Sequence, residues 1–175
     1  MGGKEKNIKL DTRFVGEIEG KFNIPSFQRG YRWGRVEVER LLDDIYLNGQ
    51  KNYCLQPIVV KRKSDVYELI DGQQRLTTLY LIYRYMNIFS NGFIDEPRFS
   101  LVYDTKEKSE EFLRSIDHTR KEENIDFWFI SNAYEIIEEW FKEKNKKSII
   151  TNINKYFDEN VKVIWYEVDE SEDSI

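Results

Sequence analysis

Residues 66–89 read VYELIDGQQRLTTLYLIYRYMNIF, which indicates a short apolar strand that passes through one glycine into a long helix. Val66, Leu69 and Ile70 are typical strand residues, and Gly72 can adopt backbone conformations that are closed to most side chains. Beyond the glycine the apolar residues follow a helical period. This period predicts one buried helix face, made of Leu76, Leu79, Tyr80, Tyr83 and Met86.

The first turn of this helix is suited to bind an anion. Gln73, Gln74 and Arg75 are expected to present unpaired backbone N–H groups at the positive end of the helix dipole, together with two amide side chains and a guanidinium. Phosphate groups commonly bind at such helix starts. Asp71 is placed either to cap the helix or to hold a cation.

Length and composition favour a folded chain of one or at most two domains. The 175 residues are 40% hydrophobic and 15% aromatic, which is enough for a sizeable core. No apolar run reaches the ~20 residues that span a bilayer, and residues 1–12 lack a signal-peptide core. The single cysteine, Cys54, cannot form an internal disulfide, and we therefore expect a reducing, cytoplasmic location without membrane contact.

Charge is distributed unevenly along the chain. Residues 1–90 hold 15 Lys and Arg against 11 Asp and Glu, a balance of +4, whereas residues 91–175 hold 12 against 21, a balance of −9. A basic front half that carries a phosphate-type turn suits a polyanionic ligand, either a nucleotide or DNA.

A second stretch, residues 22–33 (FNIPSFQRGYRW), combines arginines with aromatic residues. Arg29 and Arg32 alternate with Tyr31 and Trp33. Guanidinium groups bind phosphate in a bidentate manner, and aromatic faces stack on bases or on the guanidinium groups themselves. The alternative is a tight loop that aromatic packing holds in place.

The remaining elements predict an α+β fold, because strands and helices do not alternate as in a doubly wound sheet. Residues 8–90 are expected to form the core, with residues 91–168 as a helical extension that returns one strand, and residues 1–7 and 169–175 disordered. Pro57 is expected near the start of its strand or on a sheet edge. Strands are expected at 22–25, 54–63, 66–71, 97–104 and 161–168, and helices within 8–20 and at 34–47, 73–89, 109–118, 126–144 and 148–157.

Taken together, IPSFQRGYRW at 24–33 and IDGQQRLTTL at 70–79 resemble the N-terminal domain of the GmrSD-type restriction and phage-defence proteins. The resemblance covers most of residues 8–168, and LLDDI at 41–45 and VIWYEV at 163–168 have counterparts there. It implies a ParB/sulfiredoxin-like fold, with a small mixed sheet flanked by helices. The chain departs from the family pattern at Phe27, where a tyrosine is usual, and at Gln56-Pro57, where a glycine is usual.

The resemblance further implies a Mg²⁺-dependent nucleoside triphosphatase that controls a C-terminal HNH nuclease acting on modified phage DNA. No such nuclease centre is expected in this chain, whose only histidine is His118. The Gln73 and Gln74 amides are expected to bind the phosphates, and Arg75 with Arg29 or Arg32 to clamp them. Asp71 with Asp44 is expected to bind Mg²⁺, and Gln73 or Gln74 to orient the attacking water. Further ligand contacts are expected from Gln28, Tyr31, Trp33, Gly72, Thr77 and Thr78.

Two other interpretations remain open. The domain could sense a nucleotide or modified DNA without turnover and control a partner nuclease, with DNA contacting its basic front half. Alternatively, the motif could be structural, with Asp71 capping the helix, Gln73 and Gln74 solvated, and Arg75 paired with Glu37 or Asp44. Sulfiredoxin-like redox chemistry is disfavoured, because Cys54 lies outside the motif.

Overall fold

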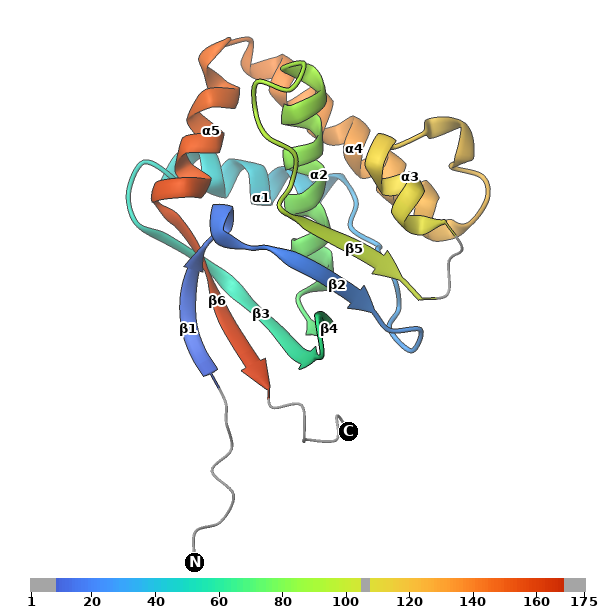
Figure 1. Cartoon of the computed structure of the whole chain (residues 1–175). Helices are drawn as coiled ribbons and strands as arrows, with labels where there is room; N and C mark the ends of the chain where they lie inside the picture. Colours follow the sequence, from blue (N-terminus) through green and yellow to red (C-terminus); the bar gives the residue numbers. More distant parts are fainter. Residues whose placement is uncertain (1–8, 105–107, 169–175) are drawn as a thin grey trace, which may run out of the picture.

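The computed structural model describes residues 9–104 and 108–168, which form a mixed sheet with its helices on one side (Figure 1). The α+β class expected from the sequence is confirmed. The predicted disorder of residues 1–7 and 169–175 lies outside the described residues. The strands are β1 Lys9–Phe14, β2 Gly20–Ile24, β3 Tyr53–Lys63, β4 Val66–Asp71, β5 Phe99–Tyr103 and β6 Val161–Val168. The helices are α1 Arg35–Asn48, α2 Gln73–Phe89, α3 Ser109–Ser115, α4 Ile125–Lys144 and α5 Ser148–Glu159, with 3-10 turns η1 Val15–Glu17 and η2 His118–Arg120.

The strand order is β1-β6-β3-β4-β2-β5. β3 and β4 form the antiparallel hairpin predicted from their sequence, and the turn places Ser64 at a φ of 58°. β4 pairs with β2, and β2 with β5, in parallel. β6 lies between β1 and β3, antiparallel to the first and parallel to the second.

The helix predicted within residues 8–20 is present only as the 3-10 turn η1, and the strand before it was not predicted. Residues Lys9–Phe14 instead form the edge strand β1, which pairs with β6 from Lys9 opposite Glu167 to Phe14 opposite Lys162. The spacing of Phe14 and Ile18 suggested a helical turn, but the pairing partner lies about 150 residues later and leaves no local signal. Four of the six β1 residues are exposed, as is usual for an edge strand.

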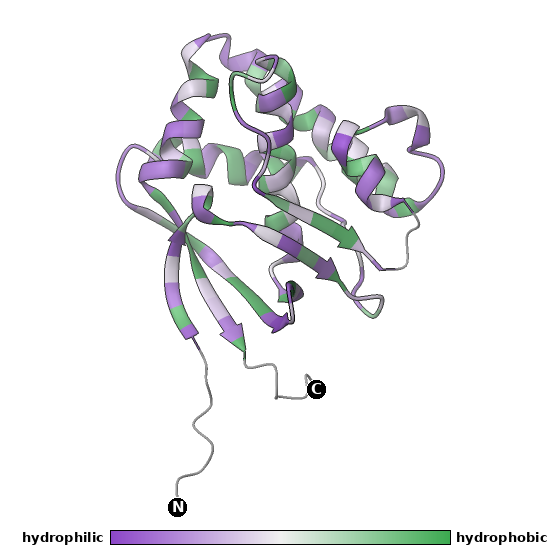
Figure 2. Ribbon diagram, in the orientation of Figure 1, coloured by the Kyte–Doolittle hydropathy of each residue, from purple (hydrophilic) through white to green (hydrophobic). Residues whose placement is uncertain are grey.

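The helices cover one face of the sheet, and the side chains of β6 are therefore buried to different degrees on its two faces. Val161, Val163, Trp165 and Glu167 are buried, and the residues between them are half-buried. Apolar and polar residues accordingly alternate as coloured bands along the strands in Figure 2. No helix in the described ranges has the length and apolar character needed to cross a membrane.

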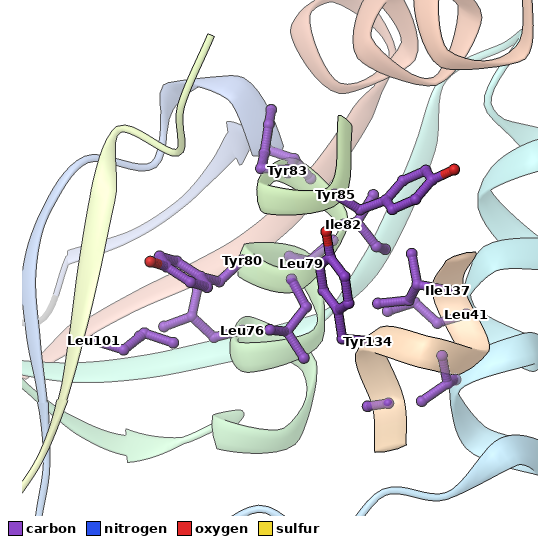
Figure 3. Packing of buried hydrophobic residues seen from close by; sticks show 14 of the residues in the cluster. Leu41, Leu76, Leu79, Tyr80, Ile82, Tyr83, Tyr85, Leu101, Tyr134 and Ile137 are labelled. Carbon is purple, nitrogen blue, oxygen red and sulfur yellow. The ribbon is translucent and has the colours of Figure 1, made fainter. Parts of the chain in front are cut away.

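Helix α2 is the centre of the core. The predicted face is buried, but burial continues without a break from Leu76 to Met86, so the expectation of a single buried face is wrong. Figure 3 shows the reason: Leu101 of β5 lies on one side of α2, and Leu41 of α1 and Ile137 of α4 lie on the other. Hydrophobic neighbours on opposite sides therefore hold this helix, and with it the start of the helix, in a fixed position.

Pro57 lies inside β3, where the ladder is interrupted, and not near its start or on a sheet edge. The register between β3 and β6 shifts between Leu55 and Ile58, and β3 pairs with β4 only from Val59 onward. A proline, which has no N–H to donate, is tolerated at such a bulge. The interruption places Gln56 and Pro57 beside the end of β4, where the candidate site begins.

Candidate functional site

The junction between β4 and α2 requires glycine at position 72. Gly72 has a φ of 97°, in the left-handed region that side chains rarely adopt. A Cβ atom there would lie 2.7 Å from Ile58 Cδ1 and 3.1 Å from the Pro57 carbonyl oxygen. The backbone of β3 therefore closes tightly on the entry to α2, and the bulge at Pro57 shapes this contact.

The amides that open α2 are available to a ligand. The first intrahelical bond runs from the Leu76 N–H to the Gly72 carbonyl, and the N–H groups of Gln73, Gln74 and Arg75 have no acceptor within the described residues. Asp71 Oδ1 accepts from its neighbour's amide, Gly72 N–H, at 2.9 Å, and no side chain caps the helix. Three donors therefore point out of a helix start where the dipole favours negative charge.

Gln28 and Gln73 tie the loop after β2 to this helix start. Gln28 Nε2 donates to the Leu69 carbonyl at 2.6 Å, and Gln28 Oε1 accepts from Gln73 Nε2 at 2.9 Å. Gln73 is 6% exposed, and its Oε1 is buried without a hydrogen-bond partner among the described residues. A buried, unpaired acceptor is costly unless a ligand or water supplies a donor.

Gln74 fixes the same loop with both of its amide atoms. Its Oε1 accepts from the Arg32 N–H at 2.7 Å, and its Nε2 donates to the Gly30 carbonyl at 2.8 Å. Gly30 has a φ of 91°, and the Asp126 carboxylate of α4 packs so closely against it that a Cβ would overlap the carboxylate. Gln74 is thereby occupied in holding the loop.

The two loop arginines point to different places. Arg32 forms an ion pair with the buried Asp126 and lies over the Phe129 ring, so its guanidinium is directed at α4. Arg29 is exposed and makes no hydrogen bond or ion pair with any described residue. Of the two, only Arg29 is positioned to contact a ligand at the start of α2.

A cavity of about 450 Å³ lies in front of the α2 start. Arg75 crosses its edge: Nη2 donates to Gln56 Oε1 at 3.0 Å, and the guanidinium lies 6.0 Å from the centre of the Trp33 ring. Partial burial lowers the pKa of Arg75, an effect that the charge of Asp71 opposes. The walls are made by Gln28, Arg29, Trp33, Gln56, Pro57, Ile70, Asp71, Gly72, Gln73, Gln74 and Arg75.

Three residues expected at the ligand are buried away from this cavity. Tyr31 is completely buried and shares a hydrogen bond of 2.9 Å with Thr78 Oγ1, and Thr77 Oγ1 lies 2.9 Å from the Tyr103 hydroxyl. Burial raises the pKa of Tyr31 and of Tyr103 well above the usual value for tyrosine. Tyr31, Thr77 and Thr78 thus join the loop, α2 and β5 inside the core.

The two carboxylates expected to share a cation line different cavities. Asp71 is exposed at the cavity in front of α2, whereas Asp44 of α1 lines a neighbouring cavity of about 230 Å³. Among residues 9–104 and 108–168 no group of three or more His, Cys, Asp or Glu side chains is placed to hold a metal ion. Asp71 is the acidic side chain of the first cavity.

The purely structural interpretation of the motif does not match these contacts. Asp71 does not cap the first turn, and Arg75 donates to Gln56, with neither Glu37 nor Asp44 within ion-pair distance. Phe27, at the position where a tyrosine is usual, is 77% exposed and is not part of the cavity wall. A hydroxyl at this position is therefore not needed to complete the cavity.

A comparison with known families identifies the family of this chain. The family description "GmrSD restriction endonuclease, N-terminal domain" matches residues 11–175. The chain belongs to this family. As a GmrSD N-terminal domain it is part of a restriction system. A comparison with curated proteins found no matching relative.

Two parts of the GmrSD site had no clear signal in the sequence. Gln56 and Pro57 enter the cavity wall because of the bulge in β3, and only the departure from the family pattern at these positions indicated their importance. Asp126 decides the direction of Arg32, but it lies 94 residues away and opens a helix that otherwise reads as core packing.

Proposed function

We propose that the cavity at the start of α2 binds the phosphates of a nucleoside triphosphate and, with Mg²⁺, catalyses its hydrolysis, so as to control the nuclease part of a restriction endonuclease. The observation that carries the proposal is the set of three unpaired amides, Gln73 to Arg75, that opens into a cavity also lined by Arg29. Backbone amides and guanidinium groups are the usual ligands of phosphate oxygens.

The side chains fit the reaction in distinct roles. Arg75 would exchange its bond to Gln56 for a phosphate oxygen, and Arg29 would approach from the opposite loop. Asp71 would hold Mg²⁺ together with phosphate oxygens, since this ion usually takes one or two carboxylates and the substrate phosphates. When bound, Mg²⁺ neutralises charge on the phosphates.

Hydrolysis requires a water molecule in line with the bond to be broken. Attack at the γ-phosphorus breaks its bond to the bridging oxygen and yields a nucleoside diphosphate and inorganic phosphate. Gln73 would orient this water if its side chain turned the buried, unpaired Oε1 toward the cavity, whereas both amide atoms of Gln74 are bonded to the loop. Removing the Gln73 side chain should lower kcat more than it weakens nucleotide binding.

The test is phosphate release from nucleoside triphosphate and Mg²⁺, measured alongside binding by calorimetry. Arg75→Ala should weaken binding by about 2 kcal/mol, roughly 30-fold, because a sheltered charge-assisted contact is lost. Asp71→Ala should abolish release. Arg62→Ala, which removes an exposed arginine at the far end of β3, is the matched control and should change neither.

The non-catalytic alternative predicts a different pattern. Gln74 and Arg32 hold the loop in place, and a domain with a rigid site could bind nucleotide and signal without turnover. Binding that Arg75→Ala weakens, with no phosphate release from any variant, would favour this alternative. Absence of binding by the unmodified chain would reject both forms of the proposal.

A further inference from the structure

A second cavity adjoins the first. It lies between α1 and the start of β3, has a volume of about 230 Å³, and shares Trp33, Gln56 and Arg75 with the cavity in front of α2. Arg75 links the other two, because it donates to Gln56 and its guanidinium lies over the Trp33 ring. A ligand that attracts the Arg75 guanidinium to its phosphates would therefore lie at the boundary between the two cavities.

The second cavity differs from the first in its chemistry. Two carboxylates, Glu37 and Asp44, line it together with the ring of Tyr53, and the guanidinium of Arg40 adds a positive charge that the two carboxylates outweigh outside the shared Arg75. Glu37 is occupied, since its carboxylate accepts from the Gly34 N–H at 3.1 Å where α1 begins. The Asp44 carboxylate accepts no hydrogen bond from any described residue. Burial raises the pKa of Tyr53, and the charge of Asp44 adds to this effect.

An unpaired carboxylate repels phosphate but accepts hydrogen bonds from hydroxyl groups. Acidic side chains bind the ribose hydroxyls of nucleotides in this manner in other folds. Aromatic walls such as Trp33 and Tyr53 provide flat apolar surface for a base. The second cavity thus offers what the uncharged end of a nucleotide requires, next to a cavity suited to the charged end.

We propose that the second cavity binds the nucleoside end of the nucleotide, with Asp44 accepting from the ribose hydroxyls and Trp33 and Tyr53 flanking the base. This inference rests on the proposed function of the first cavity and specifies its substrate class as ribonucleotides. A site that pairs a carboxylate with a hydroxyl discriminates against ligands that lack the hydroxyl, because the carboxylate is then left without a partner.

The experiment compares three kinds of ligand by calorimetry on the full chain in the presence of Mg²⁺. The ligands are the four ribonucleoside triphosphates, their 2′-deoxy counterparts and inorganic tripolyphosphate. At least one ribonucleotide should bind about 10-fold more tightly than its deoxy form, and more tightly than tripolyphosphate. Asp44→Ala should remove this preference and leave the affinity for tripolyphosphate unchanged.

The control is Glu39→Ala, which removes a carboxylate from α1 outside both cavities, where Glu39 pairs with Arg35. This variant should retain the preference for the ribonucleotide. Equal binding of ribonucleotide, deoxynucleotide and tripolyphosphate by the unmodified chain would overturn the inference and leave the phosphate site standing. If none of the three kinds of ligand binds, both this inference and the proposed function fail.

Discussion

Among single residues, Gly72 combines two constraints that can be separated by experiment. Its φ of 97° disfavours any side chain, and the neighbouring Ile58 leaves no room for a Cβ. We expect Gly72→Ala to lower the free energy of unfolding by about 2 to 4 kcal/mol, from backbone strain and displacement of β3. Urea unfolding followed by tryptophan fluorescence measures this loss.

Gly92 provides the matched control, because its φ of 86° is similar but no atom lies within 4 Å of the position that a Cβ would take. Gly92→Ala should therefore lower the free energy of unfolding only by the cost of the backbone conformation, about 1 kcal/mol. Equal losses for the two variants would mean that the close approach of β3 contributes nothing, and that the bulge at Pro57 does not constrain the site.

The two arginines of the loop should differ in what their removal changes. Arg32→Ala removes an ion-pair partner of the buried Asp126 carboxylate, and should lower the free energy of unfolding by about 2 to 4 kcal/mol. Arg29→Ala, at an exposed side chain, should change stability by less than about 0.5 kcal/mol. Chemical denaturation of both variants measures the difference, and a large loss for Arg29→Ala would contradict the assignment.

At the scale of elements, substitutions on opposite sides of α2 should lower the free energy of unfolding by similar amounts. Leu79 lies on the face that the sequence predicts to be buried and Leu81 lies off it, but both are fully buried. Each substitution by alanine should cost about 2 to 5 kcal/mol. Ile88→Ala, at a side chain that is 45% exposed, is the control and should cost much less. A small loss for Leu81→Ala, measured by urea unfolding, would show that only one face of α2 packs in solution.

Sequence patterns predicted elements whose signals are local. The apolar period of α1 and α4, the turn between β3 and β4, and the glycine before α2 all lie within a few residues of the structure they determine. The pattern failed for β1, whose partner strand is distant. It predicted α2 with its observed bounds, but not the burial of its other sides, because a helical period cannot reveal neighbours there.

The same distinction applies to the candidate site. Adjacent motif residues such as Asp71, Gln73 and Arg75 could be expected together, and the structure places them with Arg29 at one cavity. The direction of Arg32 depended on Asp126, which is far away in the sequence. Local sequence thus indicates which residues lie near the cavity, whereas long-range ion pairs decide which of their side chains face it.

At the scale of the whole molecule, the basic and acidic halves of the sequence are interleaved. β6, from the acidic half, separates β1 from β3, and α4 joins α1 through an Arg35–Glu139 ion pair of 2.8 Å. Trp140 Nε1 of α4 also donates to Asp43 of α1 at 2.9 Å. The excess of basic residues before position 90 therefore does not form a separate body, and the two cavities depend on a sheet built from both halves.

The buried phenols make the stability of the whole fold sensitive to high pH. Burial raises the pKa of Tyr31, Tyr83 and Tyr103 in the folded chain, whereas in the unfolded chain tyrosines titrate near pH 10. Above about pH 10 the unfolded state binds fewer protons than the folded state, so the free energy of unfolding falls as pH rises. The stabilisation is fully present below that pH, and each such phenol contributes a slope of up to about 1.4 kcal/mol per pH unit.

Urea unfolding at a series of pH values on either side of about pH 10 measures this slope, and the ultraviolet absorbance of tyrosinate reports which phenols ionise. Tyr31→Phe should make the free energy of unfolding fall less steeply with pH, by the contribution of one phenol, because it removes one proton that the folded state retains. Lysines that titrate in the same range affect both proteins equally, so the difference between them isolates Tyr31. If the folded chain ionised all 11 of its tyrosines near pH 10 without losing its tryptophan signal, the core around α2 would be open to water and the tight packing that positions the helix start would be refuted.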